Sequence, residues 1–228
     1  MSEIIALQIP EAISKEEYEW FLSKCTKEKQ EKLARFRYPQ DAYRSLFGEM
    51  LIRAMISKHL SLHQDQIKFE LNAYGKPHLA GVDSFHFNVS HAGKWVVAVW
   101  ARVPIGIDVE EVKSIDIRLA QRFFSKIEID DLLAKSELDQ YEYFYDLWTL
   151  KESYIKAVGK GLSIPLDSFS MRVLANGAIS VISEEEGFHC KQYPLEQGYK
   201  LSVCAIKDDF AEHVSVIQMN DLVEYLDN

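Results

Sequence analysis

Hydrophobic residues in the first half of the chain follow a helical period and then change to a strand-like period. A short apolar run predicts a strand over residues 4–9, and Ser14, Thr26 and Asp41 mark the starts of three helices. Alternating apolar and polar residues then predict a half-buried strand over 85–89. Further strands are expected over residues 95–101 and 105–109. In this half, helices therefore precede strands.

The second half repeats this order. The expected helices run from Ser114 to Phe124, from Ser125, and from about Asp139 to Val158. Glu128, three residues after Ser125, completes a capping box, and Gly159 is a natural left-handed stop. Asn176-Gly177 predicts a hairpin. The expected strands cover residues 169–174, 178–182, 189–193, 199–206 and 214–219.

The repeated order of helices and strands predicts an α+β fold with two lobes. Val103-Pro104 marks the break between them, so we expect an N-terminal lobe over residues 1–103 and a C-terminal lobe over residues 104–228. No sequence repeat is sharp enough to demonstrate a duplication. No low-complexity segment interrupts either half.

Composition narrows the class of protein. The 228 residues are 47% hydrophobic and 27% charged, as in an ordinary globular protein. A net charge of -9 disfavours nucleic acid and anionic membranes, although a local basic cluster can still bind a small anion. Three widely separated cysteines and the lack of a signal-peptide pattern favour a reduced, cytoplasmic protein.

Asp108 and Glu110 are the first candidate functional residues. They stand two apart on a predicted strand, so both carboxylates point to the same face. Adjacent like charges are unfavourable unless something neutralises them, and a hard divalent cation such as Mg²⁺ accepts carboxylate ligands. The alternative interpretation is a solvated strand end with Glu111 as one more surface acid.

A second candidate cluster is Trp148-Thr-Leu-Lys-Glu-Ser-Tyr-Ile-Lys156. Trp148, Glu152 and Lys156 lie one turn apart on one stripe of the predicted helix. Glu152 can serve as a third metal ligand or as a base, and Lys156 can hold a phosphate. The alternative is an ordinary Glu–Lys pair on a solvated face.

Two shorter segments add candidate anion-binding residues. Ser90-His91 comes just after the half-buried strand, and in Tyr74-Gly-Lys-Pro77 the proline holds Lys76 in an extended conformation. A surface histidine and an ordinary turn are the alternatives. The sequence lacks the P-loop, dinucleotide-binding and nucleophile-elbow motifs, which argues against those chemistries.

Taken together and in this order, the motifs resemble those of the 4′-phosphopantetheinyl transferases, in particular the long, surfactin-synthetase-activating type. The matching stretches are Tyr74-Gly-Lys-Pro77, Phe87-Asn-Val-Ser-His91, Gly106-Ile-Asp-Val-Glu110, Arg122-Phe-Phe-Ser125, Trp148-Thr-Leu-Lys-Glu-Ser-Tyr-Ile-Lys156 and Gly159-Lys-Gly-Leu162. The resemblance covers nearly the whole chain. It implies two similar α/β lobes related by a pseudo-twofold axis, with the active site in the cleft between them.

The resemblance also implies residue roles. Asp108, Glu110 and Glu152 match the ligands of Mg²⁺, with Mn²⁺ as the alternative metal. The residues that match contacts to coenzyme A are Lys29, Lys32, Arg44, Lys76, Pro77, Ser90, His91 and Lys156. The catalytic set is then Glu152 as general base, with Lys156 and Asp108. Val109 stands where isoleucine is frequent in the family and points to the other face.

The implied reaction moves the phosphopantetheine arm of coenzyme A to a serine of an apo carrier domain (peptidyl, acyl or aryl) and releases adenosine 3′,5′-bisphosphate. We expect a monomeric, cytoplasmic enzyme that activates nonribosomal peptide or polyketide synthases, as in antibiotic biosynthesis, with no nucleic acid or membrane partner. The alternatives are a Mg²⁺-dependent nucleotide or coenzyme A pyrophosphatase and a non-catalytic coenzyme A-binding module.

The carrier-binding surface is left open. Carrier domains are usually acidic, so a local basic patch is needed on this acidic chain. Lys113, Arg118, Arg122 and Lys126 form one candidate patch, and ordinary surface charges on two short helices are the alternative.

Overall fold

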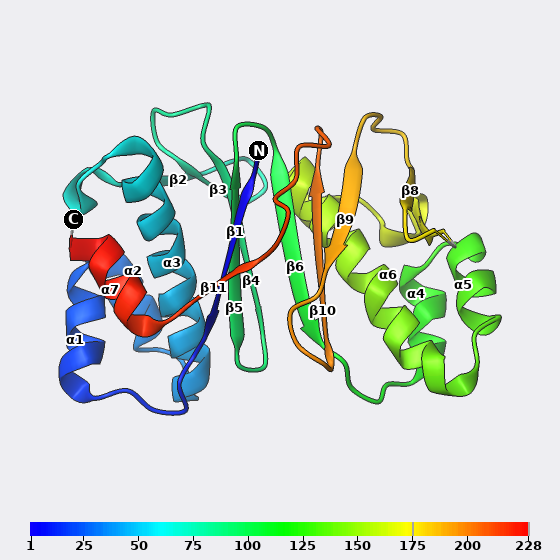
Figure 1. Ribbon diagram of the computed structural model, residues 1–228, viewed down its shortest axis with the longest axis horizontal. Coiled ribbons are helices and arrows are strands. Elements are labelled where there is room, and N and C mark those ends of the chain that lie inside the picture. The colour runs from blue at the N-terminus through cyan, green and yellow to red at the C-terminus, as the bar shows by residue number, and fades with distance from the viewer. Residues whose placement is uncertain (175, 228) are drawn as a thin grey trace.

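In the computed structural model, which describes residues 1–174 and 176–227, two sheets pack face to face and helices cover their outer faces (Figure 1). The first sheet has the strand order β11-β1-β5-β4, and the second has the order β6-β10-β9. This arrangement confirms the predicted α+β class with two similar lobes. Residues 175 and 228 of the predicted C-terminal lobe lie outside the described residues.

The first half contains three helices and six strands. They are β1 (Glu3–Gln8), α1 (Lys15–Ser23), α2 (Lys27–Leu33), α3 (Pro39–Leu60), β2 (Phe69–Leu71), β3 (Pro77–Leu79), β4 (His86–Ala92), β5 (Trp95–Ala101) and β6 (Ile105–Glu111). The side chains of Ser14 and Thr26 accept hydrogen bonds from the starts of α1 and α2, as predicted. Helix α3 begins two residues before the predicted start, because Pro39 is favourable at a first helical position.

The second half begins with helices and continues with strands. Its elements are α4 (Ala120–Phe123), α5 (Lys126–Leu133), α6 (Glu137–Val158), β7 (Ser170–Val173), β8 (Ile179–Ile182), β9 (His189–Tyr193), β10 (Tyr199–Ala205), β11 (Ser215–Ile217) and α7 (Met219–Asp227). The Ser125–Glu128 capping box and the left-handed stop at Gly159 are both confirmed. The predicted helix start at Ser114 was wrong, because Asp116 caps a short 3-10 turn that leads into α4.

Three hydrophobic clusters hold the layers together. The middle cluster joins the facing sides of the two sheets and includes Val97, Val99, Ile107, Leu201 and Val203. A second cluster lies between the first sheet and α3, and a third surrounds α6 on the far side of the second sheet. The strand faces that look away from the middle cluster therefore face helices, and the candidate acids stand on one of those faces.

Sequence reasoning missed two features. The β2–β3 hairpin has strands of three residues each, which is too short for a periodic signal. Helix α7 was missed although Met219, Leu222, Val223 and Leu226 have helical spacing.

The last segment of the chain returns to the first half. β11 pairs in parallel with β1, and α7 lies beside α3 (Figure 1). Leu222 and Leu226 of α7 are buried in the same cluster as α3. The division into lobes over residues 1–103 and 104–228 stays a prediction.

A membrane-spanning helix is not found among the described residues, since none of their helices has the required length and apolar character.

Candidate active site

Strand β6 presents the two candidate acids to helix α6. Ile105, Ile107 and Val109 point into the middle cluster, so Gly106, Asp108 and Glu110 face the other way. A Cβ at Gly106 would lie 2.1 Å from the backbone oxygen of Ser153 on α6. Glycine is therefore required there, because it lets α6 approach β6 closely enough for side chains on the two elements to meet.

Asp108 is the most constrained of the acids. Its side chain is almost fully buried, with the residue 3% exposed. Its Oδ1 accepts hydrogen bonds from Ser90 Oγ at 2.9 Å and Lys156 Nζ at 2.6 Å. Its Oδ2 is buried and has no partner among the described residues. Burial raises the pKa of Asp108, and the nearby Lys156 ammonium opposes that rise.

Glu110 and Glu152 lie within the field of Asp108. Burial, followed by the charge of Asp108, raises the pKa of Glu110 to about 7. The same two causes raise the pKa of Glu152 on α6. The fold therefore places the three acids, which come from two distant segments, within range of one another's charge. Three mutually repelling carboxylates are stable only when protons or a cation neutralise them.

The three carboxylates have the chemistry of ligands for a hard divalent cation. Three carboxylates, one of them with an unpartnered buried oxygen, are oxygen ligands of the kind that Mg²⁺ takes. As the side chains stand, no three His, Cys, Asp or Glu groups within residues 1–174 and 176–227 are close enough to hold a metal. A metal site would need the carboxylate oxygens closer together than they stand.

Lys156 and Ser90 connect the acids to strand β4. Lys156 Nζ donates to Ser90 Oγ at 3.1 Å and to the Ile107 carbonyl at 3.2 Å, in addition to Asp108. Ser90 Oγ also accepts from the Val109 backbone N–H at 3.3 Å. The sequence nominated both residues, but nothing in the sequence indicated that they contact each other and the same carboxylate.

A basic cavity reaches His91, which is close enough to Asp108 to affect the pKa of that carboxyl group. Its volume is about 420 Å³, and its lining includes Lys29, Lys32, Arg44, Pro77 and His91. Arg44 is held by Asp41 and donates to the Gly93 carbonyl at 2.8 Å. Partial burial lowers the pKa of His91, and the nearby charges of Arg44 and Lys156 lower it further. Four of the nominated basic residues therefore surround one space.

Lys76 occupies a different position from the other nominated lysines. Its Nζ donates to the backbone carbonyls of Ile105 at 3.0 Å and Lys156 at 2.5 Å, where the first half of the chain meets α6. Burial lowers its pKa to about 8. Lys76 and Pro77 also line a second cavity, of about 390 Å³, with Pro104 and Gly159.

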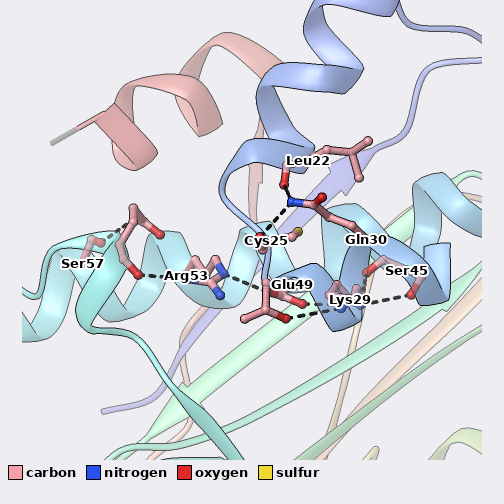
Figure 2. A network of polar contacts seen from close by, with 10 residues as sticks. Leu22, Cys25, Lys29, Gln30, Ser45, Glu49, Arg53 and Ser57 are labelled. Carbon is pink, nitrogen blue, oxygen red and sulfur yellow. Dashed lines mark hydrogen bonds and ion pairs between the residues drawn. The ribbon is translucent and has the colours of Figure 1, made fainter. Parts of the chain in front are cut away.

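The structure adds polar contacts that the sequence did not predict. Glu49 lines the basic cavity and pairs with Arg53 one turn along α3, a spacing that is visible in the sequence but common on helices (Figure 2). Trp148, which the sequence placed on one stripe with Glu152, opposes the rise in the pKa of Glu110. Lys151 is buried against Glu128 rather than facing the acids.

The candidate carrier patch is largely balanced by neighbouring acids. Lys113 pairs with Glu111 at 2.7 Å, Arg118 pairs with Asp116 at 2.7 Å, and Lys126 pairs with Asp130 at 2.9 Å. These contacts favour the interpretation as ordinary surface charges.

Comparison with known proteins identifies the family. A family model described as the 4′-phosphopantetheinyl transferase superfamily matches residues 104–204, and one described as 4′-phosphopantetheinyl transferase, N-terminal, matches residues 12–102. The 4′-phosphopantetheinyl transferase Sfp of Bacillus subtilis (strain 168) is 43% identical over 97% of this chain and 100% of its own length. The 4′-phosphopantetheinyl transferase gsp of Aneurinibacillus migulanus is 39% identical over 90% of this chain and 86% of its own length.

Similarity extends beyond bacteria. The L-aminoadipate-semialdehyde dehydrogenase-phosphopantetheinyl transferase of Homo sapiens is 27% identical over 89% of this chain and 74% of its own length. Among solved structures, a holo-(acyl-carrier-protein) synthase of Bacillus anthracis aligns with 45% of this chain and 93% of its own, at 22% identity and a TM-score of 0.40.

Proposed function

The chain belongs to the 4′-phosphopantetheinyl transferase superfamily, and on that premise we propose which of its residues bind the donor, hold the metal and move the proton. The protein is an enzyme of this class, with relatives of the same activity that match it from end to end. This match favours transfer to a carrier over the pyrophosphatase and the non-catalytic binding module.

Coenzyme A is the proposed phosphopantetheine donor, and the basic cavity is its proposed site. Lys29, Lys32, Arg44 and His91 line that cavity and would receive the 3′-phosphate. Their clustering is notable in a chain of net charge -9, because a local positive field is needed to attract an anion there. Pro77 and Lys76, at the cavity wall and the adjoining junction, are assigned to the adenosine portion.

Asp108, Glu110 and Glu152 are the proposed ligands of Mg²⁺, or of Mn²⁺ in its place. The bound cation would supply charge neutralisation at the donor's pyrophosphate. The observation that carries this assignment is the buried Oδ2 of Asp108, which has no partner within residues 1–174 and 176–227, beside two acids whose pKa values are raised. A buried carboxylate oxygen without a hydrogen-bond partner is costly unless a bound cation contacts it.

Glu152 is the proposed general base. A serine hydroxyl of the carrier attacks the β-phosphorus of coenzyme A, and the proton passes to the Glu152 carboxylate. The new bond joins the serine oxygen to phosphorus, and the bond to the departing adenosine 3′,5′-bisphosphate breaks. The raised pKa of Glu152 suits this role, because a base works best when its pKa approaches the working pH.

Lys156 and Ser90 are proposed to orient the reacting groups. The Lys156 ammonium lies 2.6 Å from Asp108 Oδ1, so it fixes that carboxylate, and it would balance charge on the phosphoryl oxygens. Ser90 holds the same oxygen from strand β4. Most of the acceleration would come from positioning and electrostatics, as in other phosphoryl transfers.

The proposed acceptors are apo carrier domains of nonribosomal peptide or polyketide synthases, as in antibiotic biosynthesis. The resemblance of the motifs to the surfactin-synthetase-activating type supports this choice. A monomeric enzyme is part of the proposal, because the acids on β6, the base on α6 and the basic cavity on α2 and α3 all come from one chain. The proposed cytoplasmic location is supported by the free cysteines, which suit a reducing compartment.

A transfer assay tests the proposal. The protein is mixed with a panel of apo carrier domains, coenzyme A and Mg²⁺, and each carrier is weighed by mass spectrometry. We expect a phosphopantetheine mass gain that a chelator abolishes. Glu152→Gln should slow the gain by about 10²–10⁴-fold, and Asp108→Asn should do at least as much.

The matched control is Glu137→Gln, which changes an exposed acid on the same helix and should transfer normally. No mass gain on any carrier would reject the assignment. Wild-type rates in Glu152→Gln would remove that residue from the mechanism.

A further inference from the structure

An acid stands among the basic residues of the donor cavity. Glu49 lines the same space as Lys29, Lys32 and Arg44. Its side chain is only 13% exposed, so its charge is weakly screened by water. A carboxylate in a phosphate site repels the ligand unless cations of the protein hold it. The contacts of Glu49 show which cations do so.

Arg53 holds one carboxylate oxygen of Glu49. Arg53 Nε donates to Glu49 Oε1 at 2.9 Å, and the arginine side chain is buried. The guanidinium also donates to the Gln64 carbonyl at 3.2 Å and lies over the Phe69 ring, with 5.4 Å between its carbon and the ring centroid. With contacts on three sides, Arg53 has little freedom to move, and the carboxylate it holds is fixed with it.

Lys29 meets the other side of Glu49. Its Nζ lies 3.5 Å from Glu49 Oε2 and donates to Ser45 at 3.0 Å (backbone oxygen) and 3.2 Å (Oγ). Ser45, Glu49 and Arg53 are spaced four residues apart, so they form one stripe along α3 (Figure 2). Lys29 comes from α2, a separate helix of seven residues, and this stripe is what holds its ammonium in place.

We propose that Glu49, held by Arg53, is a positioning residue that fixes the Lys29 ammonium at the wall of the cavity for the 3′-phosphate of coenzyme A, an inference that rests on the proposed function. A lysine side chain has many rotamers, and ordering it before the ligand arrives removes that cost from binding. The pair would then contribute to the preference for donors that carry the 3′-phosphate over donors that lack it.

If Glu49 acted only through its charge, removing it would change coenzyme A binding in the direction opposite to the one that positioning predicts. Glu49→Gln removes one negative charge from an anion site and keeps the size of the side chain. If Glu49 acted only through its field, its loss would strengthen binding of coenzyme A. If it positions Lys29, we expect the KM for coenzyme A to rise about tenfold, the factor equivalent to losing one charge-assisted contact.

The comparison uses coenzyme A and 3′-dephospho-coenzyme A in the transfer assay. The positioning role predicts that Glu49→Gln raises KM for coenzyme A alone, with kcat and the KM for the dephospho donor unchanged. Glu31→Gln makes the same charge change at an exposed position of α2 and is the matched control. In a Lys29→Met background, Glu49→Gln should have no further effect on KM, because the group that it positions is gone.

Calorimetric binding of the two donors, without carrier or metal, separates this inference from the proposed function. A tenfold weaker binding of coenzyme A alone supports positioning even if transfer fails. A KM or dissociation constant that falls, stays constant or rises equally for both donors overturns it. If Glu49→Gln does not fold, Glu49→Asp retracts the charge from both cations and must give the same donor-specific loss.

Discussion

The carboxyl group of Glu110 is partly withdrawn from water and lies in the fields of Asp108 and Glu152. Burial and these charges raise its pKa from 4.5 to about 7. The folded state therefore holds the Glu110 proton more tightly than the unfolded chain does. Below pH 4.5 both states are protonated, and between 4.5 and about 7 the folded state loses stability as pH rises. Above that range the folded protein carries a cost on the order of 1–2 kcal/mol, discounted for solvent screening.

Glu110→Gln should therefore stabilise the metal-free protein. The amide carries no charge, so at about pH 8 we expect the thermal midpoint to rise by roughly 2–4 °C, with a smaller gain at about pH 5. Circular dichroism melts at the two pH values, without divalent cations, measure the difference. The exposed Glu137→Gln serves as the control. A midpoint at pH 8 no higher than that of the wild type would contradict this account of the site.

The sequence predicted some of these residue-level features and not others. That Asp108 and Glu110 share a face follows from the two-residue period of a strand, and it is confirmed. The unpartnered oxygen of Asp108 depends on where Ser90 and Lys156 come to rest, which is a matter of tertiary packing. The role of Glu49 depends in the same way on how α2 lies against α3.

Helix α6 carries charged residues on two faces, and these residues make different contacts. Glu152 and Lys156 face β6, while Lys151, next to Glu152, points the other way into the third hydrophobic cluster. Lys151 Nζ contacts both oxygens of Glu128, at 2.7 and 2.8 Å, and the Phe169 carbonyl at 2.7 Å. Both charged side chains are 0% exposed. Burial lowers the pKa of Lys151, and the Glu128 carboxylate opposes that shift.

This buried pair joins three elements. Glu128 also accepts hydrogen bonds from the backbone N–H groups of Ser125, at the start of α5, and Met171, in β7. The network therefore fixes α5 and β7 to the helix that carries the proposed base. The capping box predicted the bond between Glu128 and Ser125, but not that the same carboxylate holds Lys151, because the box is local and the ion pair spans 23 residues.

Lys151→Met should destabilise the protein strongly. The substitution leaves the Glu128 charge buried without its cation, which typically costs about 3–5 kcal/mol. Urea unfolding measures the loss, and Lys151→Met with Glu128→Gln should recover part of it, since no buried charge remains. Lys126→Met removes a lysine from an exposed pair on α5 and should leave the midpoint unchanged. A single mutant as stable as the wild type would show that the pair is dispensable.

At the scale of the whole molecule, the two sheets share one cluster, and the chain's last helix belongs to the first half. The order of helices and strands was enough to predict two lobes, because each lobe places its helix on the outer face of its own sheet. The return of β11 and α7 was not predicted. Pairing between residues separated by most of the chain leaves no local pattern.

Weaker packing of α7 should therefore lower the stability of the half of the molecule that contains the basic cavity. Leu222 is 0% exposed and lies in the same cluster as Phe47, Leu51 and Met55 of α3, the helix that carries Arg44 and Glu49. Leu222→Ala should lower the free energy of unfolding by about 2–5 kcal/mol, since it opens a cavity that the neighbours fill only in part. Urea unfolding gives the value, and calorimetry with coenzyme A shows whether the cavity still binds.

The exposed Asn220→Ala is the control for changes to the helix itself. If α7 supports α3, the stability loss in Leu222→Ala should exceed that of the control, and coenzyme A should recover part of it, because a ligand that binds only the folded state stabilises that state. Equal stability of the two variants would mean that the first half holds its shape without α7. The donor cavity would then depend on residues before 104 alone.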